Sequence, residues 1–342
     1  MISIIIPTFN GKRFILRCLR SIYLQKKISD ASFEVIVIDN GSADKTVNEV
    51  SKHFGKKKNF KLISLPQNRG ASFARNLGVQ NSSGNILLFL DNDTTIEPCW
   101  QKKIVDFFST HQKVGLIQLK LLKKNTNKFD YAGDYMGPFG FLVERARSAV
   151  DRGQFNIPEA IFSGKSASMA MPRKVFQILQ GFDESYRIFL EDTDLAWRVW
   201  LSGFEVWFFP FIKVFHAYGT KEKTSEYYKK IEVFKLGSRN TLLTLFKNLE
   251  LSNLWWKLPL NTACWVTLAL TSICTGSLEK GTQILLGVLS AYLMFPSIIS
   301  KRRVIQSKRK IKDTELFKRV GKTMSVSYYL GKAVSYIRGK PY

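Results

Sequence analysis

Short apolar runs alternate with amphipathic segments through the first part of the chain. Each run is of strand length, and the segments between the runs carry apolar residues at helical spacing. Apolar runs of this length bounded by turn residues are typical of buried strands. Strands that alternate with helices predict a parallel sheet with helices on both faces. The predicted strands are 2–6, 33–38, 60–65 and 85–90.

Polar side chains follow each of these predicted strands. In an open α/β sheet the carboxyl ends of parallel strands share one edge, and ligands bind there. The pattern therefore predicts one site, although an ordinary polar loop is an alternative for each segment alone. The polar residues are Thr8 and Asn10, then Asp39, then Arg69 and Arg75, then Asp91 and Asp93.

The pair Asp91 and Asp93 stands directly after the fourth strand. Two carboxylates at this position suit a hard cation such as Mg²⁺ or Mn²⁺, whose other ligands are often substrate phosphates. An Asp-Asn-Asp turn is the alternative for an isolated motif. The first strand lacks the G-x-G-x-x-G of dinucleotide folds, and no G-x-x-x-x-G-K-[ST] is present. A bound nucleotide must therefore be held in another way.

The pattern is less regular after residue 96. We predict a helix over 97–110, a strand from Val114, and a variable loop region over 120–160. Pro172 is the predicted first residue of a helix that ends near Leu179. Two further strands are predicted, one over Glu205–Phe209 and one ending at His216.

Three acids lie within four residues at Glu191, Asp192 and Asp194. They can cap a helix, or they can form part of a site, and the spacing alone leaves both open. His216 stands at a strand end, where a structural role and a ligand role are both open.

After about residue 235 the alternation of strands and helices gives way to a more apolar sequence. It contains two nearly uncharged stretches, 258–275 and 282–300. Their length is at the lower limit for a helix that crosses a bilayer. We predict a spanning or re-entrant hairpin, with a pair of buried or interfacial helices as the alternative. Residues 314–338 predict one basic amphipathic helix on a membrane, with a solvated helix as the alternative.

The formal net charge of +25 implies an anionic partner, which can be nucleic acid, lipid or a phosphorylated substrate. Residues 301–342 hold thirteen Lys or Arg against two acids, directly after an apolar stretch, which favours a membrane surface. The four cysteines show no metal-type spacing, and Met1 runs directly into a predicted strand rather than a secretory signal. We therefore expect the cytoplasmic face of the cell membrane.

Taken in order, the motifs resemble the inverting nucleotide-sugar glycosyltransferases of family 2, which have a GT-A (Rossmann-like) fold. The rhamnosyltransferase-like subgroup of cell-surface polysaccharide assembly is the most similar group. The motifs are Ile6-Pro7-Thr8-Phe9-Asn10, Val37-Ile38-Asp39-Asn40-Gly41-Ser42-Ala43-Asp44, Asn68-Arg69-Gly70 through Arg75-Asn76-Leu77-Gly78, Leu90-Asp91-Asn92-Asp93, Gly181-Phe182-Asp183-Glu184, Glu191-Asp192-Thr193-Asp194-Leu195 through Arg198, and Val214-Phe215-His216.

This resemblance implies a role for each matching residue. Asp192 would be the general base, with Glu191 its neighbour in the same motif. The metal would be held by Asp91, Asp93 and His216. The donor would be bound by Thr8, Asp39, Arg69, Arg75 and Asp91. One departure is Lys165, where the family usually has a small or apolar residue, and it leaves the acceptor open.

The resemblance also implies the organisation and the reaction. We expect a catalytic domain over 1–235, with a donor half to about 95, and a helical membrane-associating region over 236–342. That region would comprise the hairpin 258–300 and the basic tail 301–342. The expected reaction is metal-dependent transfer of a sugar from a nucleotide diphosphate to a lipid-linked glycan. A nucleotidyl- or phosphotransferase with the same metal pair, and a basic nucleic-acid-binding protein, are the alternatives.

Overall fold

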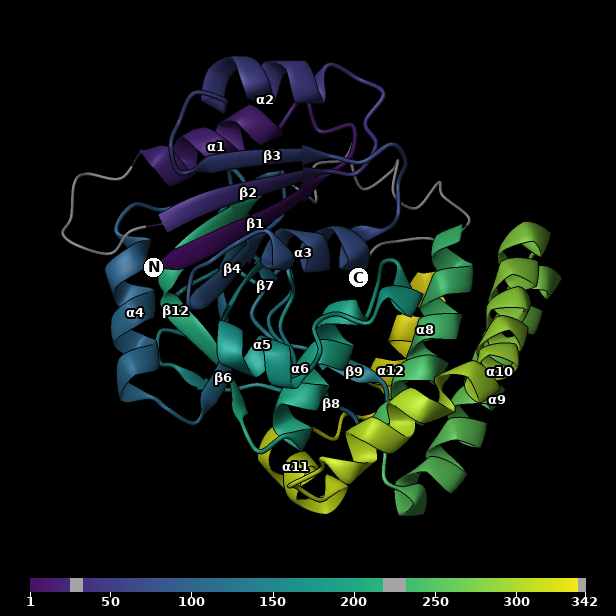
Figure 1. Ribbon diagram of the computed structural model, residues 1–342. Helices are drawn as coiled ribbons and strands as arrows, with labels where there is room; N and C mark the ends of the chain where they lie inside the picture. Colours follow the sequence, from purple (N-terminus) through teal and green to yellow (C-terminus); the bar gives the residue numbers. More distant parts are fainter. Residues whose placement is uncertain (25–32, 218–231, 338–342) are drawn as a thin grey trace. The chain divides into compact units, whose positions relative to one another are not determined.

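The computed structural model describes residues 1–24, 33–217 and 232–337 (Figure 1). The chain forms two compact units. The first unit contains 1–133, 145–199 and 204–218, and the second contains 134–144, 200–203 and 219–342. The predicted boundaries at 95 and 235 stay predictions.

A ten-stranded sheet forms the centre of the first unit, in the order β10-β12-β6-β11-β4-β1-β2-β3, with β5 paired to β12 and β7 paired to β6. The four strands predicted first lie side by side and are parallel. Their bounds are β1 Ile2–Thr8, β2 Phe33–Asp39, β3 Phe60–Ser64 and β4 Ile86–Leu90. The other strands are β5 Thr94–Ile96, β6 Val114–Lys123, β7 Phe129–Tyr131, β10 Glu159–Ala160, β11 Ser168–Pro172 and β12 Glu205–His216.

The parallel arrangement of these four strands does not extend through the whole sheet, which is mixed. Strand β11 lies antiparallel between β4 and β6. Its residues Ser168–Met171 are all buried, and an apolar run that is buried on both faces carries no signal of strand direction. Pro172 ends this strand and precedes α5 (Arg173–Ile178) instead of starting the helix. Its backbone is extended, which the fixed φ of proline permits as readily as the first helical position.

Two other predictions in this unit need correction. Residues 120–160 are not simply a variable loop, because they continue β6 and add the short strands β7 and β10. The two strands predicted before His216 are one strand, β12, with an irregular register near Phe209 and Lys213. Pro210 interrupts the apolar pattern there, but a bulge lets the strand continue.

Helices cover both faces of the sheet because alternate strand residues point to opposite sides. Ile4 and Ile6 face α1 (Ile15–Tyr23), α2 (Thr46–Phe54) and α4 (Trp100–Thr110) in one core cluster. On the opposite face α3 (Ala71–Gln80) lies so close that a Cβ on Gly78 would be 2.5 Å from Ile5 Cγ2. The sheet is thereby buried on both sides, and its carboxyl edge is left for a site.

The second unit contains five helices among its described residues and a small hairpin of β8 (Asp134–Met136) and β9 (Leu142–Glu144). The helices are α8 Glu232–Asn248, α9 Leu251–Cys274, α10 Leu278–Ser307, α11 Asp313–Val320 and α12 Val326–Ile337. Helices α9 and α10 are joined by three residues and pack on each other, while the spanning or re-entrant hairpin over 258–300 stays a prediction. Among the described residues, α10 is the one helix long and apolar enough to cross a membrane.

The single amphipathic helix predicted over 314–338 is wrong, because α11 and α12 are separated by residues 321–325. Gly321 has an extended backbone and forms a β-bridge with Met136. The predicted tail 301–342 also begins inside a helix, since α10 continues to Ser307. The first error comes from following helical spacing across Gly321, and the second comes from reading charge as a boundary.

Candidate active site

The carboxyl ends of β1 and β2 bring Thr8 and Asp39 together. These two residues are register partners in the parallel pair, and both are buried. The Thr8 hydroxyl accepts a hydrogen bond from Asn92 Nδ2 at 2.8 Å, which links β1 to the Asp91–Asp93 turn. The Asp39 carboxylate accepts from the Ser42 backbone amide at 3.0 Å and from the Ser42 hydroxyl. The predicted convergence of strand exits is confirmed for these residues.

Arg69 is held at the same edge by a neighbour for which the sequence suggested no role. Asn40 donates from Nδ2 to the Gly70 carbonyl at 3.1 Å and accepts from the Arg69 backbone amide at 2.9 Å. Arg69 itself is exposed, and its guanidinium stacks on the Phe73 ring at 3.4 Å. Asn40 therefore fixes the backbone of the turn while the Arg69 side chain remains accessible. The sequence marked Asn40 by its position directly after a strand and by its place in a family motif, but gave it no role.

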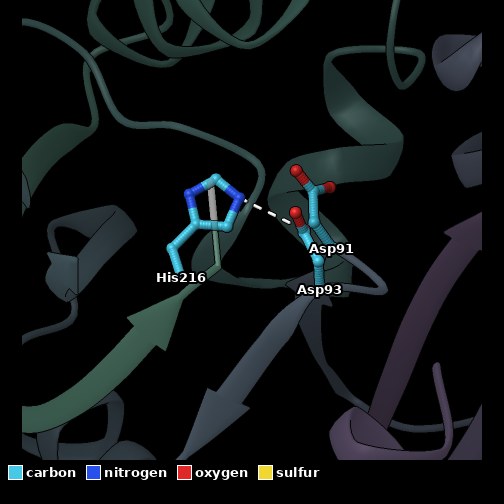
Figure 2. A group of neighbouring side chains, drawn as sticks. All are labelled: Asp91, Asp93 and His216. Atoms are coloured by element: carbon cyan, nitrogen blue, oxygen red, sulfur yellow. Dashed lines mark ion pairs between the residues drawn. The ribbon is translucent and has the colours of Figure 1, made fainter. Parts of the chain in front are cut away.

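Asp91, Asp93 and His216 lie together where β4 and β12 end (Figure 2). One ligand atom from each of the three lies within 4.8 Å of the others. His216 Nε2 is 3.2 Å from Asp93 Oδ1, the contact drawn as a dashed line. β5 creates this meeting, because Thr94 pairs with His216 in antiparallel register. Two carboxylates and an imidazole could hold a divalent cation, so the donor set fits the expected metal.

Asp130 on β7 completes this cluster and was missed by the sequence analysis. Its Oδ2 lies 2.8 Å from His216 Nδ1, and both residues are buried. A carboxylate on the second ring nitrogen is the usual way to orient a metal-binding histidine. Burial opposes charge on His216, but Asp93 and Asp130 outweigh it and raise its pKa to about 10. Burial would raise the pKa of Asp130, yet the hydrogen bond with His216 lowers it. Asp130 lay within the region predicted as loop, where no pattern marked it.

Arg75 joins the two acidic groups of the site. Its Nη2 donates to Asp91 Oδ1 at 2.9 Å, and its Nη1 donates to Glu191 Oε1 at 2.8 Å. Burial opposes the charge of Arg75, but Asp91 and Glu191 more than compensate and raise its pKa. The side chain is 5% exposed, as is that of Glu191, so this ion pair is protected from solvent. The structure thus brings together residues that are 116 positions apart in the chain.

Glu191 and Asp192 begin α6 (Glu191–Leu201) but face different surroundings. Glu191 is buried against Arg75, whereas Asp192 is partly exposed. Asp192 Oδ2 accepts from the Ser166 backbone amide at 3.2 Å, and its Oδ1 accepts from the Thr193 amide at 2.8 Å. Burial raises the pKa of both carboxyl groups. Phe189 and Leu190 both have positive φ and lead into this helix, so strained backbone sets its first residues.

Asp194, the third acid of the cluster, is structural. Its Oδ2 accepts from Arg198 Nε at 2.9 Å one turn along α6, and it is fully buried.

Lys165, where the sequence departs from the family, lies near the acids of the site. Its ammonium is 4.4 Å from the centre of the Tyr131 ring, and its charge lowers the pKa of both Asp130 and Asp192. A cation therefore stands beside the accessible carboxylate.

The sequence of this chain is similar to those of known glycosyltransferases. The profile described as Glycosyl transferase family 2 matches residues 3–177. An uncharacterized glycosyltransferase of Haemophilus influenzae is 36% identical over 163 residues, which cover 42% of this chain and 62% of that relative. The matched stretches span less of the next two relatives, 35% and 15% of their lengths.

Two solved structures have a similar fold. The structure of GalNAc-T7 with UDP, GalNAc and Mn²⁺ has a TM-score of 0.67 at 14% identity, over 97% of this chain and 57% of that one. The structure of S. aureus TarS 1–349 in complex with UDP-GlcNAc has a TM-score of 0.55 at 17% identity, over 100% and 93%. Both are glycosyltransferases with a GT-A-like fold, which confirms that part of the fold prediction. With residues 3–177 matched by the family profile, the chain belongs to glycosyl transferase family 2.

Proposed function

We propose that this chain transfers a sugar from a nucleotide diphosphate to an acceptor hydroxyl, with inversion at the anomeric carbon and with the help of a divalent cation. The observation that carries the proposal is the separation of two acidic groups by Arg75. One group is the Asp91, Asp93 and His216 cluster, and the other is the partly exposed Asp192. In sugar transfer, one acidic group holds the cation that stabilises the leaving group, and a separate carboxylate takes the proton of the nucleophile. A nucleotidyl- or phosphotransferase does not need the second group.

The donor is assigned to the edge formed by β1, β2 and β4. Asp39 would accept hydrogen bonds from the base or ribose, with Thr8 beside it at the same edge. The exposed guanidinium of Arg69 is available to a diphosphate, since Arg forms bidentate hydrogen bonds with phosphate oxygens. Arg75 contributes through Asp91, whose carboxylate it orients.

Asp91, Asp93 and His216 would hold the cation, with Asp130 orienting the imidazole. The one imidazole nitrogen favours Mn²⁺ over Mg²⁺, which prefers an all-oxygen environment. When bound, the cation supplies Lewis-acid stabilisation of the diphosphate leaving group. GalNAc-T7, whose fold is similar, was solved with UDP and Mn²⁺, which supports this assignment.

Asp192 is the proposed general base. Its carboxylate accepts the proton of the acceptor hydroxyl as that oxygen bonds to the anomeric carbon. The anomeric C–O bond to the diphosphate breaks, and its electron pair leaves with the diphosphate. One displacement without an enzyme nucleophile inverts the configuration. Glu191 acts as a positioning residue, since its carboxylate is buried against Arg75.

The proposed acceptor is a lipid-linked glycan at the cytoplasmic face of the cell membrane, in surface polysaccharide or glycoprotein glycan synthesis. Support comes from the basic, apolar C-terminal region, which would place enzyme and acceptor on one surface. A rhamnosyltransferase-like choice of donor stays a prediction.

Calorimetry and turnover assays across a panel of sugar nucleotides with Mn²⁺ or Mg²⁺ test these roles. Asp192→Asn is expected to bind the donor normally and to lose about 10²–10⁴-fold in kcat. Asp93→Ala is expected to lose cation-dependent donor binding. Asp106→Asn, a change on an exposed helix face, is the control for both. Unchanged turnover in Asp192→Asn would remove the base assignment.

A further inference from the structure

Helices α9 and α10 keep both of their lysines before residue 301 on the inside. Within Leu251–Ser300, which the structure describes completely, the charged residues are Lys257, Glu279 and Lys280. Both lysines are buried, and Glu279 lies next to the turn between the helices. Surface helices of soluble proteins have the opposite arrangement, with charged residues outward. The outward faces of α9 and α10 are therefore uncharged along the length of the hairpin.

The buried polar groups have specific partners in the second unit. Lys257 Nζ donates to the Pro138 carbonyl at 2.7 Å, and Asn261 Nδ2 donates to the Phe139 carbonyl at 2.7 Å. Lys280 Nζ donates to the Ile337 carbonyl at 3.0 Å. A buried ammonium or amide is costly without such bonds. These contacts fix which face of each helix points inward, so the apolar outward face is a defined feature of the unit.

Large apolar side chains line the outward faces at helical spacing. Trp255 is 74% exposed, Leu270 51%, Leu289 56% and Leu293 71%. The two faces meet, because the hydroxyls of Thr262 on α9 and Tyr292 on α10 lie 2.8 Å apart at an exposed position. A continuous apolar surface of this kind marks an interaction site.

Positive charge begins where the apolar face ends. The last turns of α10 and the residues after it expose Arg303, Lys308, Lys310 and Lys312. Arg302, directly before Arg303, points inward, and its Nη1 donates to the Leu249 carbonyl at 2.8 Å. An apolar face bordered by exposed cations complements an anionic lipid surface, with acyl chains under the apolar part and head groups at the cations.

We propose that the outward face of α9 and α10 lies in the interface of an anionic lipid bilayer, in the plane of the membrane. A spanning hairpin would carry the Pro138–Phe139 backbone, bonded to Lys257 and Asn261, to hydrocarbon depth. It would also carry α8, which packs along α10 and bears Lys235 and Arg239. The packing therefore selects the interfacial arrangement. This inference does not rest on the proposed function.

Vesicle sedimentation with the full chain tests the surface. Vesicles of phosphatidylcholine containing phosphatidylglycerol should bind the protein, and pure phosphatidylcholine should bind it less. Leu289→Glu with Leu293→Glu should weaken binding about tenfold or more, because two apolar anchors are replaced by charges. Ile157→Glu, at a 78% exposed apolar position in the first unit, should have no effect. Arg303→Glu with Lys308→Glu should weaken only the binding to anionic vesicles, and Lys58→Glu is the matched control.

The native cysteines provide a second measurement that does not depend on affinity. Cys264 and Cys274 are exposed on α9, while Cys99 is partly exposed in the first unit. Anionic vesicles should slow the reaction of Cys264 and Cys274 with a water-soluble maleimide and leave Cys99 unaffected. Leu278→Cys, near the turn of the hairpin, should not react with maleimide trapped inside the vesicles.

Three outcomes would overturn the proposal. The glutamate pair could bind vesicles as well as the unaltered chain does. Labelling inside the vesicles would show a spanning hairpin. Protection of both cysteines in a lipid-free dimer would assign the face to a second copy of the chain. Each result can be read in a variant with no transferase activity, so it stays distinct from the catalytic assignments.

Discussion

Arg75 and Lys257, one buried cation in each unit, are stabilised in different ways. In the first unit Arg75 is buried between the carboxylates of Asp91 and Glu191. In the second unit Lys257 is buried against a backbone carbonyl and the rings of Trp256 and Phe317. Paired charges can reorganise around a charged ligand. A lysine bonded to a backbone carbonyl instead holds two segments together, here α9 and the Pro138 loop. The first arrangement suits a reaction site, and the second suits a scaffold whose outer face is left apolar.

Removing the central cation of the first unit should have the largest effect on stability. Arg75→Met is expected to lower the free energy of unfolding by about 3–5 kcal/mol, because Glu191 is left as an uncompensated buried charge. The loss should shrink as the pH falls, since protonation of Glu191 removes that charge. Chemical denaturation at two pH values measures both effects.

Lys257→Met is the matched change in the second unit. It should cost about 1–3 kcal/mol, the penalty for one unsatisfied carbonyl. A larger loss for Lys257→Met than for Arg75→Met would break the distinction between the two units.

Asp130 tests whether the paired charges of the first unit are arranged for a cation. Asp130→Ala is expected to weaken Mn²⁺ binding about 10–100-fold, because His216 loses the group that orients its ring. Asp130→Asn should lose less, since its amide oxygen still accepts from Nδ1. Calorimetry without donor provides the measurement, and Asp106→Ala is the control. Equal Mn²⁺ affinity in all three variants would mean that Asp130 serves the fold alone.

The charge of Lys165 should set the pH dependence of turnover. The base acts in its deprotonated form, so kcat falls as the pH drops through the pKa of Asp192. Burial raises that pKa, and Lys165 partly offsets the rise. Lys165→Met should therefore move the acidic limb to higher pH. Lys174→Met, at an exposed position, should leave the profile in place. A shift to lower pH would contradict the assignment.

The smallest expected effect on stability concerns the exposed apolar face of α10, which we compare with the buried core of the first unit. Leu293→Gln on the outer face of α10 should change the free energy of unfolding by less than about 0.5 kcal/mol. Leu88→Ala in the buried strand β4 should cost about 2–5 kcal/mol. Thermal denaturation of both variants compares them. A marked loss for Leu293→Gln without lipid would show that this face packs within the protein.

The sequence was a good guide where one local pattern decided the outcome. The apolar runs of β1 to β4 predicted both the strands and the edge at which Thr8, Asp39 and Asp91 lie, because parallel strands must end on the same side. The family motifs carried the class of enzyme for the same reason, since each motif is short and local. Strand β11 was not predicted and Asp130 was missed, because the place of each is decided by pairing partners far away in the chain and not by local spacing.

What the sequence determined by itself is therefore the alternation of strands and helices, the edge of the sheet and the glycosyltransferase family. Tertiary structure alone decided which acid is buried and which is accessible, since Arg75 reaches Glu191 across 116 positions and leaves Asp192 partly open. It also decided that Lys257 of α9 and Lys280 of α10 turn inward. Composition gives the number of charged side chains, but packing decides which partner each one has and whether it faces the interior or the solvent.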